Sequence, residues 1–159
     1  MHRRLVVMGV GVVGVLVGLA VVFRVGMQRR SPGVVDAGRR ATRLMRPFAM
    51  RTAGSEGAYA SVIGHRGRRS GRPYETPVVA VQHEDGFLVA LPYGPKTDWL
   101  QNVVAAGSAT LRVDGRTHSV DHPEIISMRQ AIGHFGPREQ RLHRRYGVES
   151  CLQVHEVAS

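Results

Sequence analysis

The chain has 159 residues and a formal net charge of +10, and the positive excess is almost entirely arginine. This length suits one folded domain with an appendage. The charge favours an anionic partner, either a membrane surface or an acidic small molecule. Aromatic residues make up only 6% of the chain and are not interleaved with basic ones, so no nucleic-acid partner is expected. A single cysteine, Cys151, excludes an intrachain disulfide and a cysteine-built metal site.

An uninterrupted run of apolar residues and glycines extends from Leu5 to Phe23. As a helix this run would be about 28 Å long, close to the thickness of the hydrocarbon core of a bilayer. The run is long for a signal peptide, and no small-x-small cleavage site follows it before Arg24. We therefore expect an uncleaved transmembrane anchor over residues 1–27.

The charges around this run predict its orientation. More arginines follow it than precede it, which predicts a single-pass protein of the cell membrane whose folded domain faces the cytoplasm. Membrane lipids are then expected partners. Gly14 and Gly18 form a GxxxG pair that either packs two anchors together as a homodimer or is merely tolerated in the helix.

Residues 28–57 are predicted to form a basic juxtamembrane helix and a linker. After the Ser31-Pro32-Gly33 break, helical spacing of apolar residues predicts an amphipathic helix from Val34 to Arg46, ended by Pro47. This helix either lies on an anionic leaflet or covers one end of the folded domain. The small residues from Ala53 to Gly57 form a connector, which places the folded domain at residues 58–159.

This domain is predicted to be mainly β. Hairpin turns are expected at Glu84-Asp85-Gly86 and Asp114-Gly115, and Pro123 is expected to follow a last polar corner. The predicted strands are Tyr59–Gly64, Thr76–His83, Phe87–Pro92, Ala109–Val113, Arg116–Val120 and Cys151–Val157.

Two helical regions interrupt the strands. Thr97 or Asp98 can N-cap a helix from Trp99 to Ala106 that stops at Gly107. Residues 128–146 predict one or two short helices broken around a Gly-Pro pair. About six antiparallel strands with one inserted helix favour a small barrel.

The most unusual stretch runs from His65 to Val79. It contains Arg66, Arg68, Arg69 and Arg72 among glycines, which suits either an anion-binding loop between strands or a solvated basic turn. The two prolines that follow, at positions 73 and 77, limit the next strand to an edge or a strand start.

Three segments resemble the deazaflavin (coenzyme F-420)-dependent nitroreductase and quinone reductase family. They are G-R-R-S-G-R-P-Y-E-T-P at Gly67–Pro77, Y-G-P-K-T-D-W-L-Q-N-V at Tyr93–Val103, and Y-G-V at Tyr146–Val148. The resemblance implies an FMN-binding-like split β-barrel. It also implies an enzyme that uses reduced F-420 to transfer a hydride to a lipophilic acceptor such as a quinone or nitro compound.

The resemblance also implies a cofactor site. The phosphate and oligoglutamate tail of F-420 would need the arginines of the loop. Trp99 and Asn102 share one face of the predicted helix, although Trp99 is equally suited to a place in the core. Lys96 either meets the tail or is solvated. Tyr146 is the one tyrosine available on the substrate side. The implied cofactor-binding residues are Arg68, Arg69, Ser70, Tyr74, Thr76, Pro77, Val78, Tyr93, Gly94, Trp99 and Asn102.

Two other functions stay open. The chain could be a non-catalytic module that binds F-420 or a lipid, or a relative that uses FMN. No catalytic acid, base or nucleophile is identified, as expected where a cofactor carries the chemistry. His118 and His122 are four residues apart, but without a third ligand they read as surface histidines rather than a metal site. Cys151 reads as a small buried hydrophobe.

Overall fold

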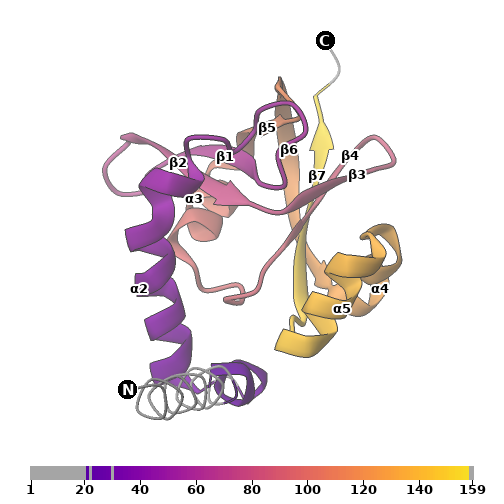
Figure 1. Cartoon of the computed structure of the whole chain (residues 1–159). Helices are drawn as coiled ribbons and strands as arrows, with labels where there is room; N and C mark the ends of the chain where they lie inside the picture. Colours follow the sequence, from indigo (N-terminus) through magenta and orange to yellow (C-terminus); the bar gives the residue numbers. More distant parts are fainter. Residues whose placement is uncertain (1–20, 22, 30, 158–159) are drawn as a thin grey trace, which may run out of the picture.

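The computed structural model of the chain describes residues 21, 23–29 and 31–157. In this part of the chain, seven strands form one antiparallel sheet in the order β2-β1-β5-β6-β7-β4-β3. The sheet is curled into a half-barrel, so the predicted mainly-β class and antiparallel sheet are confirmed, with seven strands instead of about six (Figure 1). The strands are β1 (Ser61–Arg66), β2 (Pro73–Val78), β3 (Ala80–His83), β4 (Gly86–Ala90), β5 (Ser108–Val113), β6 (Arg116–Ser127) and β7 (Ser150–Glu156).

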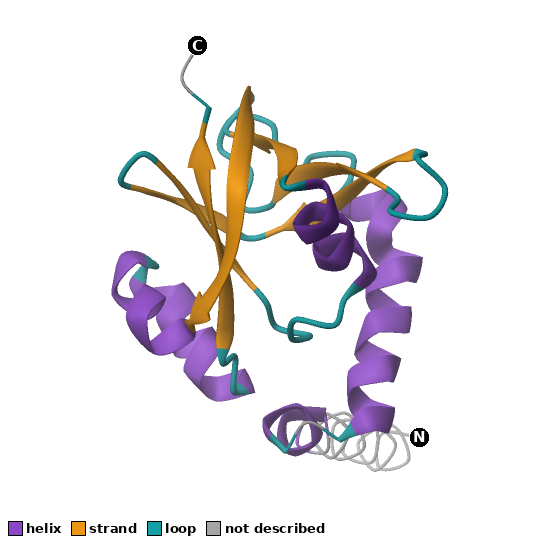
Figure 2. Cartoon of the chain, turned by 180° about the vertical axis from the view of Figure 1, so that it is seen from behind, coloured by secondary structure: helices purple, strands orange, loops and turns teal. Residues whose placement is uncertain are grey.

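The helices lie around this sheet. Seen from behind, α3 lies on the same side as α2, and α4 and α5 lie on the opposite side (Figure 2). The helices are α2 (Pro32–Ala49), α3 (Asp98–Ala106), α4 (Met128–Ala131) and α5 (Pro137–Tyr146), with the 3-10 helix η1 (Ile132–His134) between the last two.

A single residue of the chain connects the two edge strands of the sheet. β2 and β3 follow each other in the chain with only Val79 between them, yet they occupy opposite edges of the sheet. The predicted single strand from Thr76 to His83 is therefore wrong, because one valine-rich run supplies both edges. The carbonyl of Val79 accepts a hydrogen bond from the N–H of Ala90, at 3.2 Å. Proline cannot donate to a sheet ladder, which explains why Pro77 lies on an edge strand, as expected.

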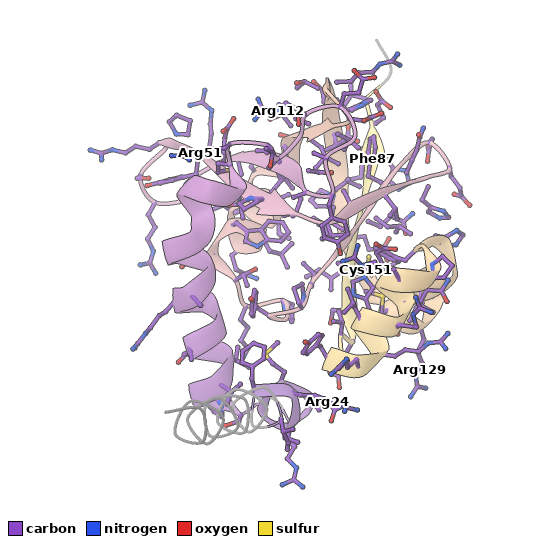
Figure 3. All side chains as sticks on the ribbon, viewed as in Figure 1. Arg24, Arg51, Phe87, Arg112, Arg129 and Cys151 are labelled. Carbon is purple, nitrogen blue, oxygen red and sulfur yellow. The ribbon has the colours of Figure 1, made fainter. Side chains whose placement is uncertain are left out.

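β4 is buried along its whole length because both of its faces are covered. Phe87 and Val89 face the core enclosed by the curled sheet, whereas Leu88 and Ala90 pack with Cys151 on the side of α4 and η1. Successive side chains of a strand point to opposite faces, so one strand serves two cores. Figure 3 shows Phe87 within the curled sheet and Cys151 between the sheet and the helices. The prediction for Cys151 is confirmed, since its side chain is fully buried.

The inserted helix and the hairpins were well predicted. α3 begins after Thr97 and ends at Gly107, which has the left-handed φ of 69° expected of a C-cap glycine. Asp114 and Gly115 form the predicted hairpin turn, both with positive φ. The corner expected just before Pro123 is instead a β-bulge within β6. The register to β7 shifts there, and the strand continues to Ser127.

The described residues include only part of the N-terminal segment for which predictions were made. The expected span from Leu5 to Phe23 lies almost entirely outside the described residues. Among the residues that are described, no helix is long and apolar enough to cross a bilayer. The predicted juxtamembrane helix is present as α2, but it continues through Pro47 to Ala49. Pro47 therefore removes one backbone donor from the last turn instead of ending the helix.

Candidate functional site

A cavity of about 670 Å³ lies between the loop after β1, strand β2, the segment after β4 and the start of α3. This volume is within the range of about 300–1,000 Å³ that is typical of small-molecule sites. Every predicted cofactor-binding residue lines it, namely Arg68, Arg69, Ser70, Tyr74, Thr76, Pro77, Val78, Tyr93, Gly94, Trp99 and Asn102. The structure thus brings two of the three resembling segments, Gly67–Pro77 and Tyr93–Val103, to one cavity, and their binding of a coenzyme stays a prediction.

Residues 66–72, which we call the arginine loop, make a tight turn between β1 and β2. The N–H of Gly71 donates to the carbonyl of Gly67 at 2.7 Å, and the N–H of Gly67 donates to the carbonyl of Arg72 at 2.8 Å. Gly71 has a φ of 64°, which favours glycine. A Cβ added to Gly67 would lie 2.9 Å from Cε2 of Tyr74. The two glycines therefore allow the loop to turn closely over the start of β2.

Asn102 of α3 holds the arginine loop in place. Its Oδ1 accepts hydrogen bonds from the backbone N–H of Arg68 at 3.1 Å and from Nη1 of Arg68 at 2.9 Å. Its Nδ2 lies 3.2 Å from Nδ1 of His65. Because these contacts are all within the protein, the geometry makes Asn102 an organiser of the loop.

The arginines of the loop differ in whether they already have a partner within the protein. The guanidinium of Arg68 makes an ion pair of 3.2 Å with Asp98, at the start of α3. Arg69 is exposed and lines the cavity, and it has no hydrogen-bond or ion-pair partner in the described part of the chain. Lys96 lines the same cavity. The cationic end of the cavity therefore presents Arg69 and Lys96 to an anion, while Arg68 is already engaged.

The N-terminus of α3 adds to this end of the cavity. Thr97 is the N-cap residue, but its side chain makes no capping hydrogen bond. Its Oγ1 is buried without a partner among the described residues, and Thr97 lines the cavity. The first backbone N–H groups of a helix are suited to anions, so this hydroxyl and helix end complement the arginine loop.

Two aromatic side chains frame the rest of the cavity. Trp99 is half-buried and packs against the main core, as its core alternative predicted, while it also lines the cavity. Its contact with a coenzyme stays a prediction. Tyr93 packs against α2, since a Cβ added to Gly38 would lie 2.9 Å from Cε1 of Tyr93. α2 therefore lies against this wall of the cavity, and both predictions for this helix stay predictions.

Sequence reasoning missed two histidines of the cavity, His65 and His143. His65 is buried at the end of β1, and its ring stacks on that of Tyr74 with centroids 5.8 Å apart. His143 is also buried, and its Nε2 has no hydrogen-bond partner in the described residues. Burial holds the pKa of His143 below its usual value, although Glu139 opposes the shift. This histidine therefore favours the neutral form.

The remaining predicted residues lie elsewhere. Tyr146 does not line this cavity; it packs against the second core and edge-on against Phe23, with ring centroids 6.3 Å apart. Its substrate-side role stays a prediction. His118 bonds to Glu156 at 2.7 Å, and His122 lies at the bulge beside Asp121. The two rings thus have separate carboxylate partners.

Comparison with known proteins identifies the family. The sequence model of the F420H2-dependent quinone reductases matches residues 39–141, which include the arginine loop, β2 and α3. No curated protein matches the chain.

Two solved structures are similar to this chain at low sequence identity. HutZ, a heme storage protein from Vibrio cholerae, is similar with a TM-score of 0.51 and 10% identity, covering 72% of this chain and 89% of its own. An F420-H2 dependent reductase, FDR-A, is similar with a TM-score of 0.46 and 12% identity, covering 61% of this chain and 94% of its own. The similarity to HutZ indicates a shared split-barrel fold.

Proposed function

The chain belongs to the F420H2-dependent quinone reductase family, and on that premise we propose that its cavity binds coenzyme F-420 for the reduction of a lipophilic acceptor, a quinone or a nitro compound. The observation that carries the proposal is one cavity of about 670 Å³ that has an apolar wall and is also lined by Arg69, which has no partner among the described residues. No finding favours FMN in place of F-420.

The residues at the cationic end fit the polyanionic tail of F-420. Arg69 and Lys96 supply positive charge, and the exposed Ser70 and the N-cap Thr97 supply hydroxyl groups on the same cavity. Hydrogen bonds between a guanidinium and a phosphate or carboxylate are among the strong ones in proteins. These side chains would hold the tail, while the rest of the cavity is left for the ring system.

The apolar end fits a planar ring and a lipophilic acceptor. Pro77, Val78 and Leu91 line it, and Trp99 closes it from α3. When bound, reduced F-420 supplies the two electrons and the hydrogen that the acceptor gains. The part of this chain is to orient the ring and the acceptor and to exclude water around them.

The acceptor also takes up a proton, and the cavity offers two phenols for it. Tyr74 and Tyr93 both line the cavity. Solvent is the other source. His143 is a poor proton donor at neutral pH, because burial lowers its pKa and so disfavours the charged form.

We propose further that residues 1–27 anchor the protein in the cell membrane, with the folded domain on the cytoplasmic side. The support is the apolar run from Leu5 to Phe23 and the excess of arginine after it. An anchor would keep the cavity near acceptors dissolved in the bilayer, and pairing through Gly14 and Gly18 would give a homodimer. The full-length chain should stay in the membrane pellet after an alkaline carbonate wash; release into the supernatant would contradict an anchor.

Turnover of purified full-length chain with reduced F-420 and menadione tests the enzymatic proposal. We expect oxidation of the coenzyme that depends on both protein and quinone. Binding of F-420 without quinone-dependent oxidation would instead favour the second candidate, a non-catalytic F-420-binding module.

A further inference from the structure

His65 joins the two ends of the cavity through hydrogen bonds. Its Nδ1 lies 3.2 Å from Nδ2 of Asn102, and its Nε2 lies 3.2 Å from Oγ1 of Thr76. The ring is buried, with 8% of its surface exposed. His65, Asn102 and Thr76 all line the cavity, so a chain of hydrogen bonds runs from the arginine loop to β2 beside the bound ligand.

The direction of these hydrogen bonds is fixed at Arg68. Oδ1 of Asn102 receives the backbone N–H and Nη1 of Arg68, and both of these groups can only donate. The amide is therefore oriented with its oxygen towards Arg68 and its NH₂ towards His65. An NH₂ group also can only donate, so Nδ1 of His65 must accept. The ring is then neutral, with its proton on Nε2.

The protonation of His65 determines which hydrogen bond the hydroxyl of Thr76 can make. Nε2–H of His65 donates to Oγ1 of Thr76, so one lone pair of the hydroxyl is used by the protein. The hydroxyl proton must then point elsewhere, and the described part of the chain supplies no acceptor for it. Because Thr76 lines the cavity, this proton is available to a ligand.

We propose that His65 is a positioning residue that sets the hydroxyl of Thr76 as a hydrogen-bond donor into the cavity. The site would then select a ring system with an acceptor atom, such as a carbonyl oxygen, beside β2, while the anionic part of the ligand lies at Arg69. This inference rests on the proposed function for the identity of the ligand. The competing explanation is that His65 only fills space beneath Tyr74, on which it stacks.

The protonated ring nitrogen of His65 can be measured without any ligand. Nitrogen-15 NMR of the ligand-free full-length chain should show the Nε2-protonated neutral ring. In Asn102→Asp, the amide donor becomes a carboxylate acceptor, so the proton should move to Nδ1. A wild-type ring protonated on Nδ1, or on both nitrogens at neutral pH, would overturn the inference.

Binding of F-420 tests the effect on Thr76. Thr76→Val should weaken binding about threefold to tenfold, the effect of one neutral hydrogen bond, whereas Thr76→Ser should stay within about twofold. In a His65→Phe background, which keeps a ring beneath Tyr74, Thr76→Val should cost less than about twofold because the hydroxyl is no longer oriented. Equal losses in both backgrounds would show that His65 does not position Thr76.

The proposed F-420 binding and the proposed role of His65 can be refuted independently of each other. If the chain binds no F-420, the proposed function fails, while the protonation of His65 in the ligand-free protein still tests the hydrogen-bond chain. If His65→Phe does not fold, the comparison of Thr76→Val with Thr76→Ser and the NMR measurement still decide whether the hydroxyl donates as expected.

Discussion

Replacing Arg69 with alanine is the most selective perturbation of the proposed anion site. Arg69 lines the cavity and has no partner among the described residues, so its guanidinium is available to a ligand. Arg72→Ala is a matched control, because Arg72 is exposed in the same loop but does not line the cavity. Both substitutions remove one positive charge, and only the first should remove a contact.

The expected size of the effect comes from one lost charge-assisted hydrogen bond. Such a bond contributes about 1.5–3 kcal/mol, so Arg69→Ala should weaken F-420 binding about 10- to 150-fold. Arg72→Ala should cost less than about twofold, because Arg72 does not line the cavity and an exposed charge without a direct contact is weakened by salt screening.

Arg68 should behave differently from both. Its ion pair with Asp98 is partly exposed, with side-chain exposures of 33% and 83%. Breaking such a pair costs at most about 1 kcal/mol, so Arg68 can turn to the ligand. The double replacement of Arg68 and Arg69 should therefore weaken binding more than Arg69→Ala alone.

Fluorescence titration of F-420 with each purified variant measures these affinities, and thermal melting checks that each variant is folded. Raising the salt concentration should weaken wild-type binding more than binding by Arg69→Ala. Equal affinities of the Arg69 and Arg72 variants, with both folded, would refute the assignment of Arg69 to the anion site.

Three further predictions concern stability and reactivity. Gly86→Ala should unfold the domain or lower its melting temperature strongly, because the added Cβ would overlap the backbone carbonyl of Val154; a melting curve like that of the wild type would contradict this packing. Burial raises the pKa of the Cys151 thiol to about 12. The native protein should therefore resist alkylation by iodoacetamide at pH 8 and react once it is unfolded. Rapid labelling of the native protein would instead show that the thiol is accessible. His143 is neutral when buried but takes up a proton on unfolding below about pH 6.5. The free energy of unfolding of the wild type, measured with urea, should therefore fall between pH 7 and pH 5 more than that of His143→Phe. Parallel pH profiles of the two proteins would refute the lowered pKa of His143.

Much of the fold could be read from local sequence patterns. The Asp114-Gly115 turn and the Gly107 helix end are set by short-range backbone preferences, and both were located correctly. The division of the run at Val79 was not predictable in this way, because both of its halves are extended and β-branched. Only the curl of the whole sheet decides that one half pairs with β1 and the other with β4.

The candidate site shows the same limit. The arginine loop and Asn102 were found because they carry short motifs with distinct chemistry. His143 carries no such motif, and it reaches the cavity only because α5 packs back onto the barrel. His65 opens the arginine stretch, but its role depends on bonds to Thr76 and Asn102 that no local pattern indicates.

The central claim is that this cavity holds coenzyme F-420, and side-by-side fluorescence titrations of the full-length chain with F-420 and FMN test it most directly. We predict saturable binding of F-420, tighter than binding of FMN and weakened by Arg69→Ala. Absence of F-420 binding, or tighter binding of FMN, would contradict the claim.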